Sequence, residues 1–190
     1  MKTIILNGCL KNNESMDSLQ SITEGALQKA GYEVEAVVLH EKKIGECLGC
    51  FHCWMKTPGM CIIEDDSREL NGKIINSDLV VYMTPVTFGG YSSELKKAVD
   101  RIIPLMLPFF TNRQGEIHHQ ARYKSYPRVL VLGVMTEENK EMEQIFRDIV
   151  KRNEKNWFNS FAGIVLQADG IEDAGMAIDK VISDWRQEKC

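Results

Sequence analysis

Four of the six cysteines in this chain fall within fifteen residues, at Cys47, Cys50, Cys53 and Cys61. Two successive gaps of two residues let the first three thiolates converge on one point from a single short loop. Clusters of the 4Fe–4S type are usually held in this way, with a fourth cysteine from further along the chain. Structural zinc more often uses two separated Cys-x2-Cys pairs, and no second separated pair is present. A 4Fe–4S cluster is therefore the first hypothesis for these cysteines.

The same residues leave three other interpretations open. The segment can be a metal-free loop, because an unmodified cysteine packs as a small hydrophobe near a cofactor or at a subunit interface. Zinc bound by three or four of the thiolates, together with His52, is a further hypothesis. A disulfide is disfavoured in a reducing compartment. Cys190 ends the chain, and we expect it to be a dispensable exposed thiol.

The composition bounds the class of protein. A chain of 190 residues is expected to form one domain, 1–190, with enough apolar residues for one core. The net charge of −4 argues against nucleic acid as a main partner, because phosphate binding needs a basic surface. We find no stretch with the features of a signal peptide or a membrane span, so a cytoplasmic location is expected and no membrane partner.

The elements that would position the reactive residues alternate between strand and helix. Apolar runs predict five strands, at 2–6, 33–39, 78–84, 128–134 and 161–167. Helical spacing and end signals predict five helices, at 15–30, 66–76, 93–106, 138–156 and 172–187. An apparent capping box, Asp66 to Glu69, opens the second helix. The segment 107–126 shows no periodicity and is interpreted as an insertion or lid. The cysteine-rich loop, residues 47–61, is a separate segment.

This alternation predicts an open, mostly parallel sheet covered by helices on both faces. In such sheets ligands bind beyond the carboxyl ends of the strands. The loops to examine are therefore 8–18, 85–93 and 133–139.

The first of these loops contains small, amide and hydroxyl residues immediately before a helix. Backbone N–H groups and the helix dipole favour a phosphate there, with Lys11 and serine hydroxyls as further donors. Glu14 and Asp17 oppose this interpretation, and a polar capping loop is the alternative. The loop has no Gly-x-Gly-x-x-Gly pattern, which disfavours a dinucleotide site of that type.

The second loop, 85–93, is more specific. Pro85 restricts the turn, Gly89 and Gly90 permit positive φ, and the aromatic rings of Phe88 and Tyr91 can lie along a flat ring system. Backbone amides exposed on such a loop can hydrogen-bond the polar edge of a flavin.

Taken together, the phosphate-type loop, the cysteine segment followed by Asp65 and Asp66, and the Pro-Val-x-Phe loop followed by Asp100-Arg101 resemble the NADPH-dependent FMN reductase group of the flavodoxin-like superfamily. The cysteine spacing is similar to that of the iron–sulfur flavoproteins in that group. The resemblance implies a flavodoxin-like three-layer α/β sandwich with a five-stranded parallel sheet of order 2-1-3-4-5.

The resemblance also implies bound FMN. The residues that would face its phosphate are Cys9, Lys11, Ser15 and, less directly, Ser18. Those that would border its ribityl chain and ring are Pro85, Val86, Thr87, Phe88, Gly89 and Gly90. The group commonly has Ser where Cys9 stands, Arg where Lys11 stands and an aromatic residue where Thr87 stands.

The function implied is an oxidoreductase that passes electrons from NAD(P)H through FMN to a small or protein acceptor, as a homodimer or larger oligomer. The cofactor carries the chemistry, so no catalytic side chain is predicted. A one-electron carrier, of the iron–sulfur flavoprotein or flavodoxin kind, is the alternative. A zinc-stabilised binding module without flavin is the third class.

Overall fold

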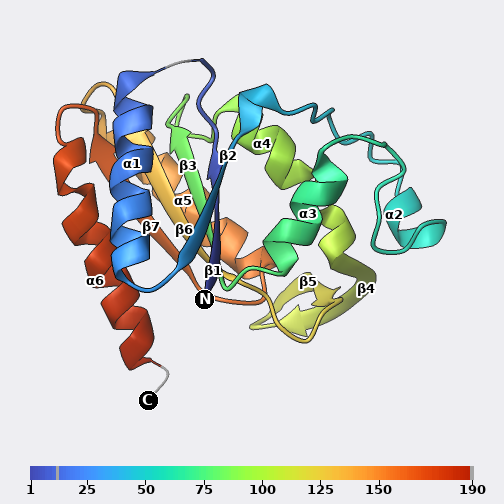
Figure 1. Ribbon diagram of the computed structural model, residues 1–190. Coiled ribbons are helices and arrows are strands. Elements are labelled where there is room, and N and C mark those ends of the chain that lie inside the picture. The colour runs from blue at the N-terminus through green and yellow to red at the C-terminus, as the bar shows by residue number, and fades with distance from the viewer. Residues whose placement is uncertain (12, 189–190) are drawn as a thin grey trace.

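Five parallel strands form the central sheet, in the order β2-β1-β3-β6-β7 (Figure 1). The strands are β1 (Lys2–Asn7), β2 (Glu33–Val38), β3 (Leu79–Pro85), β6 (Arg128–Met135) and β7 (Phe161–Gln167). Counting only these parallel strands, the order is 2-1-3-4-5, as predicted. The predicted flavodoxin-like α/β class is confirmed.

The structure is a computed structural model that describes residues 1–11 and 13–188. Helices α1 (Glu14–Lys29) and α6 (Ala174–Gln187) pack together on one face of the sheet. Helices α3 (Ser67–Ile75), α4 (Ser93–Asp100) and α5 (Lys140–Asn156) cover the other face (Figure 1). The helices on both faces explain why the central strands are apolar throughout rather than alternating.

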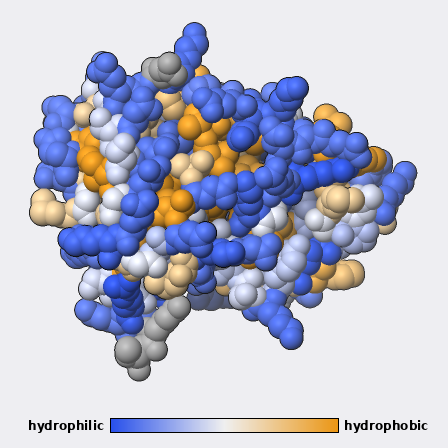
Figure 2. Space-filling model, in the orientation of Figure 1, coloured by the Kyte–Doolittle hydropathy of each residue, from blue (hydrophilic) through white to orange (hydrophobic). Residues whose placement is uncertain are grey.

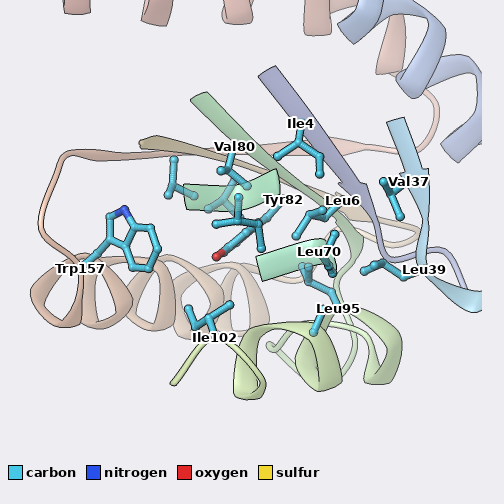
Figure 3. Close-up of a cluster of buried hydrophobic side chains, with 14 of the residues drawn as sticks. Ile4, Leu6, Val37, Leu39, Leu70, Val80, Tyr82, Leu95, Ile102 and Trp157 are labelled. Carbon is cyan, nitrogen blue, oxygen red and sulfur yellow. The ribbon is translucent and has the colours of Figure 1, made fainter. Parts of the chain in front are cut away.

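Two cores result, because successive side chains of a strand point to opposite faces. Ile4 and Tyr82 belong to the core on the α3–α5 side, part of which is drawn in Figure 3. Ile5 and Val81, their neighbours in sequence, belong to the core beneath α1 and α6. The two layers hold the carboxyl ends of β1, β3 and β6 in fixed relative positions.

Local polar residues set the helix starts. Asn13 accepts hydrogen bonds from the first turn of α1, and Asn139 does the same for Met142 of α5. At α3 the predicted capping box is wrong. The Asp66 side chain accepts from the backbone N–H of Lys43, and Asp65 accepts from the N–H of Ser67 instead.

The region after α4 also differs from prediction. The helix ends at Asp100 rather than near residue 106, and a 3-10 turn, Ile103–Leu105, follows with Pro104 inside it. The segment expected to lack regular structure is an antiparallel hairpin of β4 (Met106–Arg113) and β5 (Glu116–Ala121). Gln114 and Gly115 turn the hairpin with positive φ angles of 53° and 83°.

Residues 45–65, here called the cysteine lobe, contain only one short helix, α2 (His52–Met55). The lobe projects beside the β4–β5 hairpin at the right of Figure 1. In Figure 2, apolar groups reach the surface at this end of the molecule. Two further 3-10 turns are Leu39–Glu41 and Ile171–Asp173. Among the described residues, no helix is long and apolar enough to cross a membrane.

Candidate functional site

The loops that follow β1, β3 and β6 meet at one edge of the sheet, because these three strands are adjacent and parallel (Figure 1). Hydrogen bonds join the loops directly. The Gly8 N–H donates to the Met83 carbonyl at 2.7 Å, and the Ser92 hydroxyl donates to the Gly8 carbonyl at 2.5 Å. The Val86 N–H donates to the Val134 carbonyl at 2.8 Å. The predicted first and second loops therefore form one continuous rim.

A glycine is required at position 8 because the first and second loops approach each other closely there. A Cβ atom at this position would lie 2.7 Å from the Leu95 Cβ and 2.8 Å from the Ser92 Oγ. The neighbouring Asn7 is buried, and its side chain accepts from the Cys9 N–H and donates to Gln20. Asn7 and Ser92 thus fix the start of the first loop, although neither was predicted as a site residue.

The four predicted residues of the first loop differ in their accessibility. Cys9 is buried, and its thiol donates to the Lys11 carbonyl. Lys11 and Ser18 are exposed, and Ser15 is partly exposed, at or near the amino end of α1. Lys11 and the serines are thus open to an incoming anion, whereas Cys9 shapes the backbone of the loop. The Asn13 side chain already accepts from the N–H groups of Ser15 and Met16.

The second loop contains a two-residue turn at Phe88 and Gly89, with positive φ angles of 50° and 74°. Thr87 and Gly90 flank the turn and exchange backbone hydrogen bonds of 3.0 and 2.9 Å. We expected positive φ at Gly89 and Gly90, but Phe88 takes one of these conformations and Gly90 does not. Phe88 is 92% exposed. A bulky exposed residue in a left-handed conformation is uncommon and often marks a functional position.

Gly89 has a structural role in this turn. It is buried, and an added Cβ would lie 2.7 Å from the Ile145 Cγ2 of α5. A Cβ atom at Gly90 would be less crowded, because its nearest neighbour would be the Thr87 carbonyl oxygen at 3.5 Å. The turn is therefore seated on α5, and the exposed Phe88 ring is held at the rim.

This rim has the chemistry that a phosphate ester of a flat ring system requires. An ammonium group, two hydroxyls and a helix amino end lie on one side. A tight turn with an exposed aromatic ring lies on the other. The acidic side chains of Glu14 and Asp17 in the first turn of α1 reduce the attraction for an anion. The donor set at the rim fits FMN.

The cysteine lobe presents a different arrangement. Cys47 and Cys50 are exposed, Cys61 is partly buried and Cys53 is buried. Burial raises the pKa of the Cys53 thiol, and Cys61, Cys47 and Cys50 raise it further. Within residues 1–11 and 13–188, no three His, Cys, Asp or Glu side chains are grouped so that they could hold a metal ion. The predicted four-thiolate cluster is therefore not shown by this arrangement. Cys190 lies outside the described residues.

A buried arginine, Arg101, holds the two ends of the cysteine lobe together. The Arg101 side chain is 1% exposed and donates from Nη1 to the Gly45 carbonyl at 2.7 Å and to Asp65 Oδ2 at 2.8 Å. Its Nη2 donates to Asp65 Oδ1 at 3.0 Å and to the Cys61 sulfur at 3.3 Å. Burial acts to raise the pKa of Asp65, but hydrogen bonds from Arg101 and Ser67 lower it to about 2. Arg101 therefore joins both ends of the lobe to α4.

Contacts between aromatic rings attach the lobe to the hairpin. The Trp54 ring lies 5.2 Å from that of Phe51 and 4.7 Å from that of His119, and His119 lies 4.8 Å from Phe110. The Trp54 indole N–H also points to the carbonyls of Ile103 and Met106, at 3.2 and 3.0 Å. His52 and His119 each have a buried Nδ1 atom without a partner in the described chain. Among the described residues, these histidines belong to no group of three His, Cys, Asp or Glu side chains that could hold a metal ion.

Residues 1–119 match the sequence profile of the family described as NADPH-dependent FMN reductase. The chain belongs to this family. The matched residues include the rim loops after β1 and β3 and the whole cysteine lobe. The loop after β6 and helix α5 lie beyond the match.

Curated relatives of the chain carry the name iron–sulfur flavoprotein. One, from Methanocaldococcus jannaschii, is 34% identical over 109 residues, which cover 57% of this chain and 55% of the relative. Another, from Archaeoglobus fulgidus, is 31% identical over 104 residues, which cover 55% and 46%. The chain thus spans about half the length of the curated relatives it matches.

Solved structures of low sequence identity share the fold. An NAD(P)H:quinone oxidoreductase from Methanothermobacter marburgensis superposes with a TM-score of 0.70 at 12% identity, over 96% of this chain and 94% of that one. An FMN-dependent NADH-azoreductase from Bacillus anthracis, solved with FMN, gives a TM-score of 0.66 at 14% identity, over 97% and 99%. At these identities the likeness shows the fold alone.

Proposed function

We propose that the chain is an FMN-dependent oxidoreductase that takes electrons from NAD(P)H and passes them to an acceptor. The observation that carries this proposal is the joined rim, in which the Ser92 hydroxyl ties the loop after β3 to Gly8 in the loop after β1. Both loops lie within the part of the chain that matches the FMN reductase family. When bound, FMN would supply the hydride and electron chemistry that the side chains of the rim lack.

The first loop would hold the phosphate end. Lys11 brings a positive charge, and Ser15 and Ser18 bring hydroxyl donors beside the amino end of α1. The Cys9 thiol, bonded to the Lys11 carbonyl, would keep the loop backbone in its bent form rather than donate to the phosphate. The backbone N–H of Cys9 already donates to the Asn7 side chain.

The second loop would hold the ring end. Pro85 and Val86 continue from the sheet, and Thr87 and Gly90 close the turn through their backbone bonds. Gly89 seats the turn on α5, so that the Phe88 ring stays exposed at the rim. Phe88 would then border the space in which a nicotinamide or an acceptor approaches.

An anaerobic reduction experiment tests the activity. Protein loaded with FMN is mixed with NADPH, and in a parallel sample with NADH, in the absence of oxygen. We expect the flavin absorbance to disappear with one or both nucleotides and to return on addition of a quinone or another acceptor. A flavin that binds tightly but is reduced by neither nucleotide would contradict the reductase and favour a carrier.

The second candidate function is a one-electron carrier with a 4Fe–4S cluster on Cys47, Cys50, Cys53 and Cys61. The name of the curated relatives favours it, as does the presence of four free thiols in one lobe. In such a site the Cys61 sulfur, which accepts from Arg101 in the present structure, would bind iron together with the buried Cys53 and the exposed Cys47 and Cys50.

Anaerobic reconstitution with iron and sulfide separates the two candidates. A cluster on the lobe would give broad visible absorbance that each of the four Cys→Ala variants reduces, while Cys9→Ala leaves it unchanged. Uptake of zinc in place of iron would favour the structural metal site. The absence of both, together with nicotinamide oxidation, would leave the two-electron reductase alone.

We also propose a homo-oligomer in a reducing cytoplasm. Exposed apolar side chains on the lobe and hairpin, among them Met55 and Phe110, support an interface. Sedimentation analysis of the purified chain tests the oligomer directly, and a purely monomeric result would overturn it.

A further inference from the structure

A cavity of about 130 Å³ lies on the α4–α5 side of the sheet, apart from the rim loops. Strands β3 and β7, the end of α4 with the turn after it, and the end of α5 form its walls. The lining residues are Tyr82, Val99, Ile102, Ile103, Met106, Asn153, Asn156, Trp157 and Phe161. Most of these side chains are apolar, so the cavity is suited to an apolar molecule.

Tyr82 contributes a hydroxyl to this apolar space. The residue is 2% exposed and belongs to the middle of β3. In Figure 3 its hydroxyl oxygen lies on the side of the cluster where Trp157 and Ile102 lie, and both of these residues line the cavity. Burial raises the pKa of Tyr82, so the phenol stays protonated and can donate a hydrogen bond. We find no hydrogen bond to this hydroxyl from any residue that the structure describes.

The other polar groups of the wall are already engaged. The Asn153 side chain donates to the Tyr91 hydroxyl at 2.9 Å. The Asn156 side chain pairs with His118 at 3.1 Å and donates to the Arg152 carbonyl. Among the polar side chains of the wall, the Tyr82 side chain is thus the one for which the described residues provide no hydrogen bond.

Size and polarity together select the kind of occupant. An apolar cavity of roughly 150 Å³ can stay dry and bind benzene, so 130 Å³ suits a molecule with a single ring. A buried water normally needs two to four polar partners, whereas most of this wall is apolar. A ligand that accepts a hydrogen bond from the Tyr82 hydroxyl would gain affinity over one that cannot.

We propose that this cavity is a binding site for a one-ring aromatic molecule with one hydrogen-bond acceptor, such as a phenol or an aryl ketone, which accepts from the Tyr82 hydroxyl. The site is separate from the rim proposed for FMN. Its ligand should therefore bind with similar affinity whether or not flavin is present.

The test uses 4-fluorophenol as the probe and fluorine NMR to follow its binding to the full chain. Two variants are compared with the wild type. Tyr82→Phe removes the hydroxyl and keeps the ring, and we expect it to weaken binding roughly fivefold to tenfold. Val99→Phe places a larger side chain in the cavity, and we expect it to abolish binding. Thermal unfolding of each variant confirms that it is folded.

Several results would overturn the proposal. Absence of binding to the wild type up to the solubility limit of the probe would show that the cavity takes no such ligand. Binding that Val99→Phe leaves unchanged would place the probe elsewhere. Equal binding by wild type and Tyr82→Phe would refute the role of the hydroxyl. Loss of probe binding on addition of FMN would show that the two molecules share the rim.

Discussion

The rim and the cysteine lobe are both candidates for redox chemistry, but they are held in place by different means. The rim loops extend directly from the buried strands β1, β3 and β6 and are joined mainly by backbone groups, as in the bond from Gly8 to Met83. The lobe has one short helix and is attached through side chains, chiefly Arg101 and Trp54. The rim should therefore tolerate many side-chain changes, whereas single substitutions should release the lobe.

Replacement of Arg101 should have the largest effect. Arg101→Met removes the partner of the nearly buried Asp65 carboxylate, and breaking such a pair costs about 3–5 kcal/mol in the free energy of unfolding. The matched control is Arg152→Met, whose pair with Glu116 is exposed and should contribute about 0–1 kcal/mol. Urea unfolding measures both. Equal effects would show that Arg101 is no more important than a surface arginine.

Removal of the Trp54 ring should come next. Trp54→Ala deletes the contacts with Phe51 and His119, and we expect a loss of about 2–3 kcal/mol. The effect should be local to the lobe, so the buried Cys53 should react faster with an alkylating reagent. Trp54→Phe keeps a ring and should cost less. Unchanged labelling of Cys53 in Trp54→Ala would show that the ring contacts of Trp54 do not hold the lobe.

Acid should weaken the lobe before the rim. The pKa of Asp65 is lowered from 3.8 to about 2 in the folded chain, so its stabilising contribution is fully present above pH 4 and is lost as the pH falls toward 2. The expected loss is about 2 kcal/mol. The free energy of unfolding, measured between pH 4 and pH 2, should not show this pH dependence in Asp65→Asn. A wild-type profile identical to that of the variant would contradict the paired state of Asp65.

The smallest of these effects concerns the rim. Gly89→Ala would place a Cβ 2.7 Å from Ile145 in a positive-φ conformation, and should cost about 1–2 kcal/mol and weaken FMN binding. Gly90→Ala, whose Cβ would make ordinary contacts, should be close to neutral. Thermal unfolding and FMN titration of the two variants measure these effects. A neutral Gly89→Ala would mean that the turn is not seated on α5.

Much of the sheet and the position of the rim follow from the sequence, for a physical reason. Buried parallel strands require continuous apolar runs, so segments such as β3 and β6 are evident, and their loops must share one edge. The hairpin could not be found in this way. Its strands are partly polar and exposed, a bulge interrupts the pairing near Pro108, and Gln114 rather than glycine begins the turn.

The arrangement of the cysteine lobe could not be predicted from cysteine spacing. Two-residue gaps do not indicate which of the thiols are buried. Here Gly49 and Phe51 take left-handed conformations, and α2 turns Cys53 inward while Cys50 stays exposed. Arg101 was visible in the sequence only as part of an Asp-Arg pair. Its contact with Asp65, 36 residues away, depends on the fold.

Equilibrium titration of the flavin-free chain with FMN and with riboflavin tests the central claim most directly. If the first loop holds the phosphate, FMN should bind more tightly than riboflavin, and Lys11→Ala should reduce this preference roughly fivefold to tenfold. Lys29→Ala, at the opposite end of α1, should leave the preference unchanged. Equal binding of FMN and riboflavin by the wild type, or equal effects of the two lysine variants, would contradict a phosphate site at this rim.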